Sequence, residues 1–272
     1  MAVCTAREIR DSENVFIGIG VPLLGGMLAK ATHAPNATLF YECGSVGAER
    51  FRPSYTVSDT THGDRPYYIT TMTRTFSDIQ RGYMDVAVIG AAQIDIYGNL
   101  NTTVVGDYNS PITRLPGSGG ANDAGSSAKR IICMMALEKK RFLKRVNYIT
   151  TPGFIDGPEG RKKAGILGGG PSVVITNKGI MRFDDKTKEM YLASVYPGVS
   201  VDDIKKEVSW ELKVASDLNQ VEPPKTQEIQ MLRTFDSMGI ILGETKKKIT
   251  FEEWVKKYQE STEALWKLAD IC

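Results

Sequence analysis

Residues 14–41 carry the hydrophobic pattern of a β-α-β unit. Residues 14–19 (NVFIGI) form a short β-rich run, and residues 38–41 (TLFY) begin another. Between them, Pro22 opens a predicted helix over residues 23–31. Its larger apolar side chains recur at helical spacing: Leu23, Leu24, Met27 and Leu28. A helix of this length can cross over between two parallel strands, so the segment predicts part of a parallel sheet.

Further apolar runs continue this pattern. A predicted helix over residues 76–83 leads into the strand 86–89 (VAVI), which lacks the polar alternation of a half-exposed strand. Further buried strands are predicted at 131–135 and 173–176, and another strand at 148–151. Strands of this kind are covered on both faces, which predicts a layered α/β fold with a mainly parallel sheet.

The last third of the chain has a different texture. Two short β-rich runs, at residues 180–183 and 190–193, flank a polar turn and predict a peripheral β-hairpin. Neither an internal repeat nor a low-complexity segment interrupts the chain, so we interpret residues 1–272 as a single domain.

Residues 246–272 predict a peripheral C-terminal helix. Apolar and aromatic side chains recur there at helical spacing, and Thr250 with Glu253 three positions later fits a capping box. We expect this helix to pack on its own domain or on a partner subunit.

The composition narrows the classes of function. The 272 residues are 42% hydrophobic and 24% charged, with a formal net charge of +2, so the chain lacks the basic character of a nucleic-acid or membrane-surface protein. Its apolar runs fall short of the roughly 20 residues of a transmembrane helix, and the N-terminal residues lack the apolar core of a signal peptide. We expect a soluble, cytoplasmic protein that binds neither nucleic acid nor membrane.

Cysteine and histidine are sparse. The cysteines are widely spaced, without a CxxC pair: Cys4, Cys43, Cys133 and Cys272. With His33 and His62 as the only histidines, we expect no disulfide framework and no metal site. We expect His33 to cap backbone carbonyls near the end of its helix. His62 lies in a polar loop, and the sequence offers no support for a general-base role.

The first candidate for chemistry is Glu42, where the strand 38–41 meets a turn containing Gly44. Ligands bind at the carboxyl edge of parallel strands, so a carboxylate there faces the crevice. Its desolvation is costly unless it has partners or a task. The alternative is a surface glutamate at a strand end. The neighbouring Cys43 is a candidate for orienting substrate, with a small core residue as the alternative.

The second candidate is the glycine-rich loop LPGSGGAND (residues 115–123). Its backbone N–H groups can converge on an oxyanion and leave room for a bulky substrate. It lacks the GK[ST] ending of a P-loop and the third glycine of a dinucleotide fingerprint. The residues expected to contact the oxyanion or the substrate are Gly117, Gly119, Gly120, Ala121 and Asn122. A flexible connector is the alternative.

The third candidate is the amide-rich segment after the strand 86–89. Gln93 and Asn99 can orient a thioester or a carboxylate by neutral hydrogen bonds. The same amides can equally satisfy the backbone of the loop.

Taken together, these segments resemble the B subunits of the family I coenzyme A transferases, most closely those of the glutaconate type. The similarity runs over about residues 14–196. The segments that carry it occur in the same order: GAAQIDIYGNLNTT (90–103), TRLPGSGGAN (113–122), TPGFIDGP (151–158) and KGIMRF (178–183). The resemblance implies an open three-layer α/β/α fold with a mainly parallel sheet.

The resemblance also implies a mechanism. The nucleophile of these B subunits is the glutamate of a Glu-Ser-Gly motif, and Glu42-Cys43-Gly44 matches it with cysteine in place of serine. Glu42 would attack an acyl-CoA thioester, and CoA would then pass through a glutamyl thioester to a carboxylic acid, including dicarboxylic acids. The loop 117–122 would stabilise the oxyanion. No cofactor is implied, since CoA enters with the substrate. The implied partner is an A subunit, in an α2β2 or larger assembly.

Two other hypotheses remain. The wider family includes B-type subunits that act on CoA thioesters as ring-opening C–C hydrolases or as decarboxylases, in which Glu42 would be an acid/base or binding group. The chain would otherwise be a non-catalytic component that binds acyl-CoA and relies on its partner for the reaction.

Overall fold

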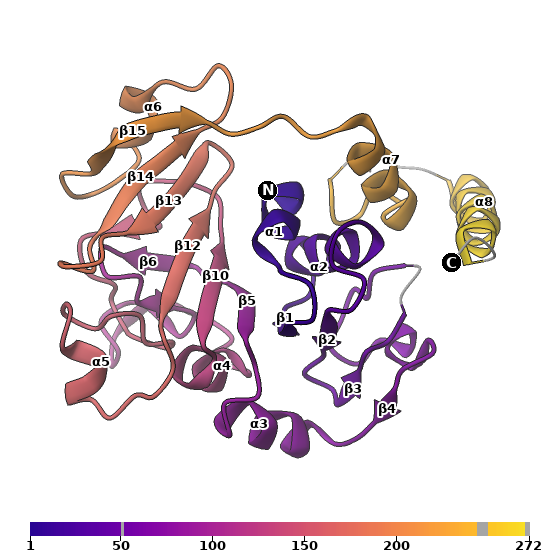
Figure 1. The fold of residues 1–272 in the computed structure, drawn as a ribbon, viewed down its shortest axis with the longest axis horizontal. Coiled ribbons are helices and arrows are strands. Elements are labelled where there is room, and N and C mark those ends of the chain that lie inside the picture. Colours follow the sequence, from indigo (N-terminus) through magenta and orange to yellow (C-terminus); the bar gives the residue numbers. More distant parts are fainter. Residues whose placement is uncertain (50–51, 244–249, 270–272) are drawn as a thin grey trace.

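The computed structural model describes residues 1–49, 52–243 and 250–269, which are built around a ten-stranded sheet (Figure 1). Five neighbouring parallel strands form its centre: β2 (Thr38–Phe40), β1 (Asn14–Ile17), β5 (Val86–Gly90), β10 (Arg130–Met134) and β12 (Pro171–Ile175). In this register Val15 lies between Leu39 and Val86. The prediction of a mainly parallel sheet is confirmed.

Antiparallel strands extend both edges of this centre. Beyond β12 lie β13 (Gly179–Phe183), β14 (Met190–Val195) and then β15 (Lys213–Gln220), which is parallel to β14. Beyond β2 lie β3 (Ser45–Val46) and β4 (Tyr68–Ile69). The predicted hairpin is confirmed as β13–β14, but it is not peripheral. Met190, Leu192 and Val195 are buried, so the hairpin continues the central sheet and its core.

Helices cover both faces of the sheet. One face packs against α1 (Ala2–Glu8), α2 (Val21–Ala31) and α7 (Thr226–Phe235). The other packs against α3 (Met72–Gln80), α4 (Ala121–Ser127) and α6 (Val201–Lys205). Successive residues of one strand serve opposite cores: Val15 and Ile17 belong to the first, and Phe16 to the second. The three-layer α/β/α prediction is confirmed.

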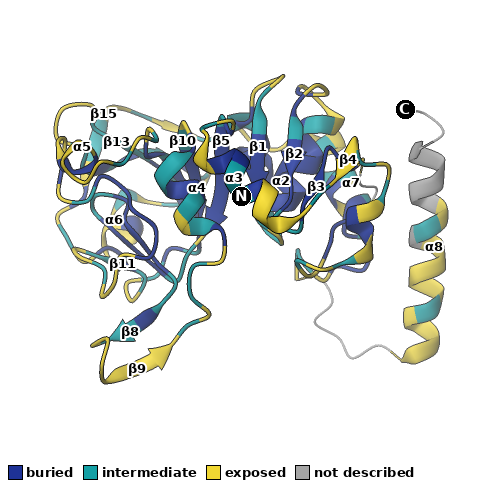
Figure 2. Cartoon of the chain, turned by 90° about the horizontal axis from the view of Figure 1, so that it is seen from below, coloured by how far each residue is buried: buried dark blue, intermediate teal, exposed yellow. Residues whose placement is uncertain are grey.

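Smaller elements lie outside this sheet. β6 (Gln93–Asp95) pairs with both β7 (Leu100–Asn101) and β11 (Phe142–Leu143). β8 (Val104–Gly106) and β9 (Pro111–Arg114) form a ribbon that extends away from the body (Figure 2). The short helices are η1 (Thr60–Gly63) and α5 (Gly160–Lys163). None of the helices in the described ranges has both the length and the apolar character needed to cross a membrane.

The strand predicted at residues 148–151 is wrong. Only a single bridge, between Thr151 and Leu100, joins this segment to a strand. Tyr148 and Ile149 are 40% and 39% exposed, and the Thr150 hydroxyl accepts the N–H of Thr102. This segment is a loop in spite of its β-rich composition, and its hydrogen bonds connect it to other loops. The sequence interpretation also missed α1 and α7.

His33 is hydrogen-bonded to a backbone carbonyl, but not to one at the end of its own helix as predicted. Its Nε2 lies 3.0 Å from the carbonyl oxygen of Ile9, which follows α1. The capped carbonyl therefore belongs to the end of α1, while His33 itself follows α2. The side chain links the two helices that cover one face of the sheet.

The C-terminal helix α8 (Phe251–Ala269) begins with the predicted capping box. The Thr250 N–H donates to the Glu253 carboxylate at 2.8 Å, and the Glu253 N–H donates to the Thr250 hydroxyl at 3.2 Å. Phe251, Trp254 and Tyr258 are exposed, but the Arg52 guanidinium donates to the Tyr258 hydroxyl at 2.6 Å and lies 5.8 Å from the centre of its ring. This part of the stripe therefore contacts its own domain at Tyr258, while Phe251 at its start is 78% exposed. Packing on a partner subunit stays a prediction. Residues 246–249 and 270–272 of the predicted helix lie outside the described residues.

Candidate active site

Glu42 is placed by a tight turn at the carboxyl end of β2. The Gly44 N–H donates to the Tyr41 carbonyl at 3.0 Å and closes the turn around Glu42 and Cys43. Gly44 has φ 105°, and a Cβ there would lie 2.1 Å from the Thr70 carbonyl oxygen. A side chain at this position would therefore clash with the backbone that follows β4. The glycine lets the chain reverse immediately after the strand, and the turn projects Glu42 from the edge of the sheet.

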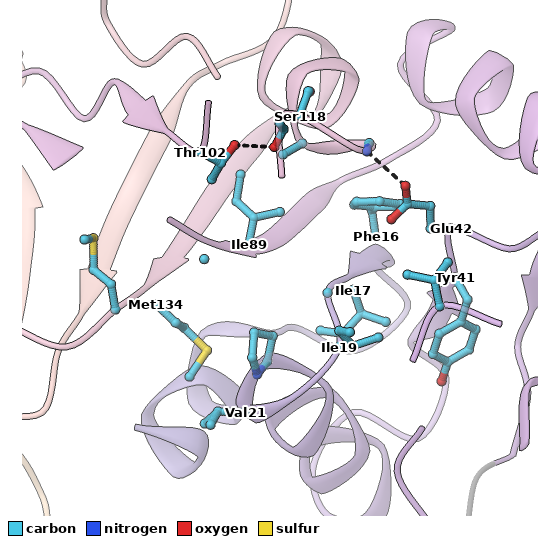
Figure 3. Close-up of a pocket in the computed structure, with 18 of the residues that line it drawn as sticks. Phe16, Ile17, Ile19, Val21, Tyr41, Glu42, Ile89, Thr102, Ser118 and Met134 are labelled. Atoms are coloured by element: carbon cyan, nitrogen blue, oxygen red, sulfur yellow. Dashed lines mark hydrogen bonds between the residues drawn. The ribbon is translucent and has the colours of Figure 1, made fainter. Parts of the chain in front are cut away.

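The structure brings Glu42 together with the glycine-rich loop. The Gly120 N–H donates to Glu42 Oε1 at 3.1 Å, and Figure 3 shows this hydrogen bond. The Glu42 side chain is half-buried, and the described residues give it no ion-pair partner. Its carboxylate is thus oriented by a neutral donor and remains available as a nucleophile.

The loop is hydrogen-bonded to a neighbouring segment. The Gly117 N–H donates to the Thr102 carbonyl at 2.8 Å. The Thr102 hydroxyl donates to the Gly117 carbonyl at 2.7 Å, and this second hydrogen bond is drawn in Figure 3. Gly120 fits closely, since a Cβ there would lie 2.7 Å from the Phe76 ring. Asn122 is directed away from Glu42 and donates to the Thr150 carbonyl at 2.8 Å. The alternative of a flexible connector does not fit these contacts.

A cavity of about 520 Å³ opens beside Glu42 at the carboxyl ends of β1, β2, β5 and β10 (Figure 3). This is the edge at which ligands bind in open parallel sheets. Four residues of the predicted loop segment line it: Gly117, Ser118, Gly120 and Ala121. Other residues that line the cavity include Phe16, Ile17, Ile19, Tyr41, His62, Ile89, Thr102, Met134 and Met135. Most of the apolar members lie at the carboxyl ends of strands that are distant in sequence, so only this position in buried strands could have indicated them.

His62 borders the cavity, although nothing in its sequence context singled it out. It is 7% exposed, within η1, and its Nε2 lies 3.2 Å from the Thr56 carbonyl oxygen. Its ring packs edge-on against Tyr41 with 5.2 Å between centroids. These contacts fix the imidazole as part of the wall next to Glu42.

Gln93 and Asn99 do not border the cavity, so their interpretation as substrate-orienting residues is corrected. Asn99 is fully buried and donates to both oxygens of Asp95, at 3.1 and 3.0 Å. Gln93 is 4% exposed and donates to the Asn147 side chain at 2.9 Å. Burial raises the pKa of Asp95, and the hydrogen bonds from Asn99 oppose this shift. Both amides are used to satisfy buried groups of the β6–β7 region.

Cys43 is half-buried and packs against the core on the α1–α2 face. It follows Glu42 but does not line the cavity. The alternative of a small core residue describes its position better than contact with substrate. Within the described part of the chain, His, Cys, Asp and Glu side chains form no group of three or more suited to a metal ion.

Replacing Gly119 by alanine is expected to lower kcat by about 3- to 10-fold, because the Glu42 carboxylate would have to shift by a few tenths of an ångström. Gly119 has φ 50°, and a Cβ there would lie 3.2 Å from Glu42 Oε1, so it would press on the carboxylate. The control is Gly165→Ala, at φ 68° with open space around the new Cβ. Both variants should lose about 1 kcal/mol of stability to backbone strain. The measurement is steady-state kinetics of both variants. Equal kcat values for Gly119→Ala and Gly165→Ala would contradict the placement of Gly119 beside Glu42.

Comparison with known proteins agrees with this geometry. Residues 1–207 match the family described as Coenzyme A transferase. The chain is 38% identical to the B subunit of glutaconate CoA-transferase from Acidaminococcus fermentans, covering 85% of this chain and 89% of that protein. It is 32% identical to the B subunit of 3-oxoadipate CoA-transferase from Pseudomonas knackmussii, covering 87% and 92%.

A solved structure shares the fold as well. The crystal structure of glutaconate coenzyme A-transferase from A. fermentans superposes with a TM-score of 0.84 at 37% identity, covering 89% of this chain and 95% of that one. The residues that line the cavity all lie within residues 1–207, the region that matches the family. The chain belongs to the coenzyme A transferase family.

Proposed function

We propose that this chain is the B subunit of a CoA-transferase in which Glu42 carries CoA between an acyl-CoA and a carboxylic acid. The observation that carries the proposal is a carboxylate at the carboxyl edge of a parallel sheet, facing a cavity and oriented by the N–H of Gly120. Relatives named as B subunits of CoA-transferases support transfer over C–C hydrolysis or decarboxylation.

In the first half-reaction a Glu42 oxygen attacks the thioester carbonyl carbon. The C–S bond breaks, and the products are an acyl-glutamyl anhydride and CoA thiolate. The thiolate then attacks the glutamyl carbonyl, which forms a glutamyl-CoA thioester and releases the acyl group as a carboxylate. In the second half the acceptor carboxylate attacks this thioester, and the same two steps run in reverse. CoA is thereby moved without net consumption of water.

Attack of the thiolate on the glutamyl carbonyl forms an oxyanion on Glu42 itself, and this oxyanion needs a fixed donor. The Gly120 N–H is 3.1 Å from the carboxylate that becomes the reacting group, and Gly119 adjoins it. The apolar walls of the cavity would keep water from the anhydride. The anhydride keeps the acyl group activated, so the free energy of the thioester is conserved as long as water does not hydrolyse the anhydride.

An A subunit is the partner that the relatives support, because both are named as B subunits. The α2β2 assembly and the cytoplasmic location stay predictions. The relatives are named for dicarboxylic acids, so such acids are candidate acyl groups here. CoA is part of the substrate, and the proposal includes no cofactor.

The glutamyl-CoA thioester on Glu42 is a covalent adduct of this chain, and its detection tests the proposal directly. The complex of both subunits is incubated with acetyl-CoA, butyryl-CoA or glutaryl-CoA without an acceptor acid, and the intact mass of this chain is measured. We expect an increase equal to CoA less one water, absent in Glu42→Gln. If the complex that contains the Glu42→Gln chain transfers CoA as fast as the wild-type complex, this chain is a non-catalytic component and the reaction belongs to its partner. Turnover without any adduct, together with solvent isotope in the product, would favour hydrolysis or decarboxylation.

A further inference from the structure

Gly120 contacts two aromatic side chains that come from different elements. A Cβ at this position would lie 2.7 Å from Cε1 and 3.3 Å from Cζ of Phe76, and 3.0 Å from Cζ of Phe16. Phe76 belongs to α3, and Phe16 belongs to β1. Phe16 lines the cavity beside Glu42 (Figure 3), whereas Phe76 is not among the described residues that line it. Phe76 is therefore placed to act through Gly120 and not through contact with substrate.

The loop that ends at Gly120 has little conformational restraint of its own. Gly117 and Gly119 have φ of 101° and 50°, a region of backbone space that is open mainly to glycine. A glycine also lacks a side chain that could pack and fix it. The position of the loop therefore depends on the groups around it, which are Thr102 at the Gly117 end and the Phe76 ring at the Gly120 end.

The helix α3 also supports the turn that carries Glu42. The Thr70 N–H, two residues before α3, donates to the Gly44 carbonyl at 2.8 Å. At the other end of α3, the Gln80 side chain donates to the Asp123 carboxylate of α4 at 2.7 Å. One helix is thus connected both to the turn of the nucleophile and to the helix that follows its donor, although nucleophile and donor are 78 residues apart in sequence.

We propose that Phe76 is a positioning residue of the transfer reaction, whose ring keeps the Gly120 N–H directed at the Glu42 carboxylate. The inference rests on the proposed function and deepens it by assigning a role to a residue outside the cavity. The donor stabilises the oxyanion on Glu42 only while it stays at hydrogen-bond distance. Leucine lacks Cε1 and Cζ, the two ring atoms of Phe76 nearest to the Gly120 position, so Phe76→Leu leaves room for the loop to withdraw.

The first measurement compares Phe76→Leu with Ile79→Val. Ile79 lies on the same helix and is fully buried in the core against which Phe76 packs, so its variant controls for a loss of packing. The complex of both subunits is mixed with whichever of acetyl-CoA, butyryl-CoA and glutaryl-CoA forms the adduct on the wild-type chain, and adduct formation is followed in single turnovers. We expect Phe76→Leu to lower the maximal rate about tenfold, with the half-saturating donor concentration within about twofold of the wild type. Ile79→Val should keep both values within about twofold.

A double-variant cycle tests the contact itself. Gly120 has φ −78° and ψ 0°, which any residue adopts, so the Cβ of Gly120→Ala would act by pressing on the two rings. We expect Gly120→Ala to lower the rate of adduct formation about tenfold, because the loop is displaced from Glu42. Phe76→Leu removes the atoms nearest to this Cβ. The combined loss in the double variant should therefore be at least about threefold smaller than the product of the two single losses.

The outcomes separate the positioning role from the proposed function. Equal maximal rates in Phe76→Leu and Ile79→Val, or a change confined to the half-saturating concentration, would overturn the positioning role and leave Glu42 as the nucleophile. Single losses that simply multiply in the double variant would overturn it as well. If Phe76→Leu does not assemble, Gly120→Ala decides: a reduced rate supports the role, and the wild-type rate overturns it. Absence of any adduct on the wild-type chain would overturn the proposed function, and this inference with it.

Discussion

Replacement of Glu42 by alanine or glutamine is expected to reduce kcat by at least about 10⁴-fold, because removing a covalent nucleophile costs on the order of 10⁶-fold in well-studied enzymes. Glutamine keeps the size and the hydrogen-bond acceptor that faces the Gly120 N–H, so it removes the nucleophile with little change in packing. Glu42→Asp should lose about 100-fold or more, since a shorter side chain withdraws the attacking oxygen. The measurement is CoA transfer by the assembled enzyme.

The matched control for Glu42 is Glu211→Gln. Glu211 is exposed and does not line the cavity, so the same chemical change there should leave kcat within about twofold of the wild type. Activity of Glu42→Gln within about tenfold of the wild type would refute the nucleophile role. A loss that appears only in KM would instead assign Glu42 to substrate binding.

The fold was largely predictable because its central strands are buried on both faces. Such strands appear as uninterrupted apolar runs, as at Val86 to Ile89, and the helices between them carry a clear stripe. The failure at residues 148–151 has the opposite cause. The Thr150 hydroxyl of that segment makes side-chain hydrogen bonds to Thr102 and Thr103 of another loop, and such long-range contacts leave no periodic pattern.

The candidate site was predictable to the extent that it depends on backbone conformation. Glu42 follows a buried strand and precedes a glycine, and three glycines mark the loop that meets it. The roles of Gln93 and Asn99 were not predictable. Whether a buried amide faces a ligand or another side chain depends on which loops pack beside it, and here Asp95 and Asn147 take those hydrogen bonds.

Arg161 supports the site from a distance, in a way that no sequence pattern reveals. It is 6% exposed, and its guanidinium donates to five backbone carbonyls at 2.8–3.2 Å: those of Pro152, Gly153, Gly168, Gly125 and Ser126. The last two belong to α4, which begins directly after Gly120. Burial lowers the pKa of Arg161 to about 10, so the group still carries its charge at neutral pH. One side chain thereby joins α4 to two loops.

Arg161→Met is expected to lower the free energy of unfolding by about 3–5 kcal/mol, because it leaves several buried carbonyls without a donor. For a chain of this size, that change lowers Tm by roughly 6–20 °C. The control is Lys162→Met on the same helix, whose side chain is 85% exposed and whose loss should cost no more than about 0.5 kcal/mol. Thermal unfolding of the assembled enzyme measures both variants. Since α4 carries the Gly120 end of the loop, Arg161→Met should also reduce CoA transfer below its Tm. A variant as stable and active as Lys162→Met would show that solvent or neighbouring groups replace the guanidinium, and that the position of α4 does not depend on it.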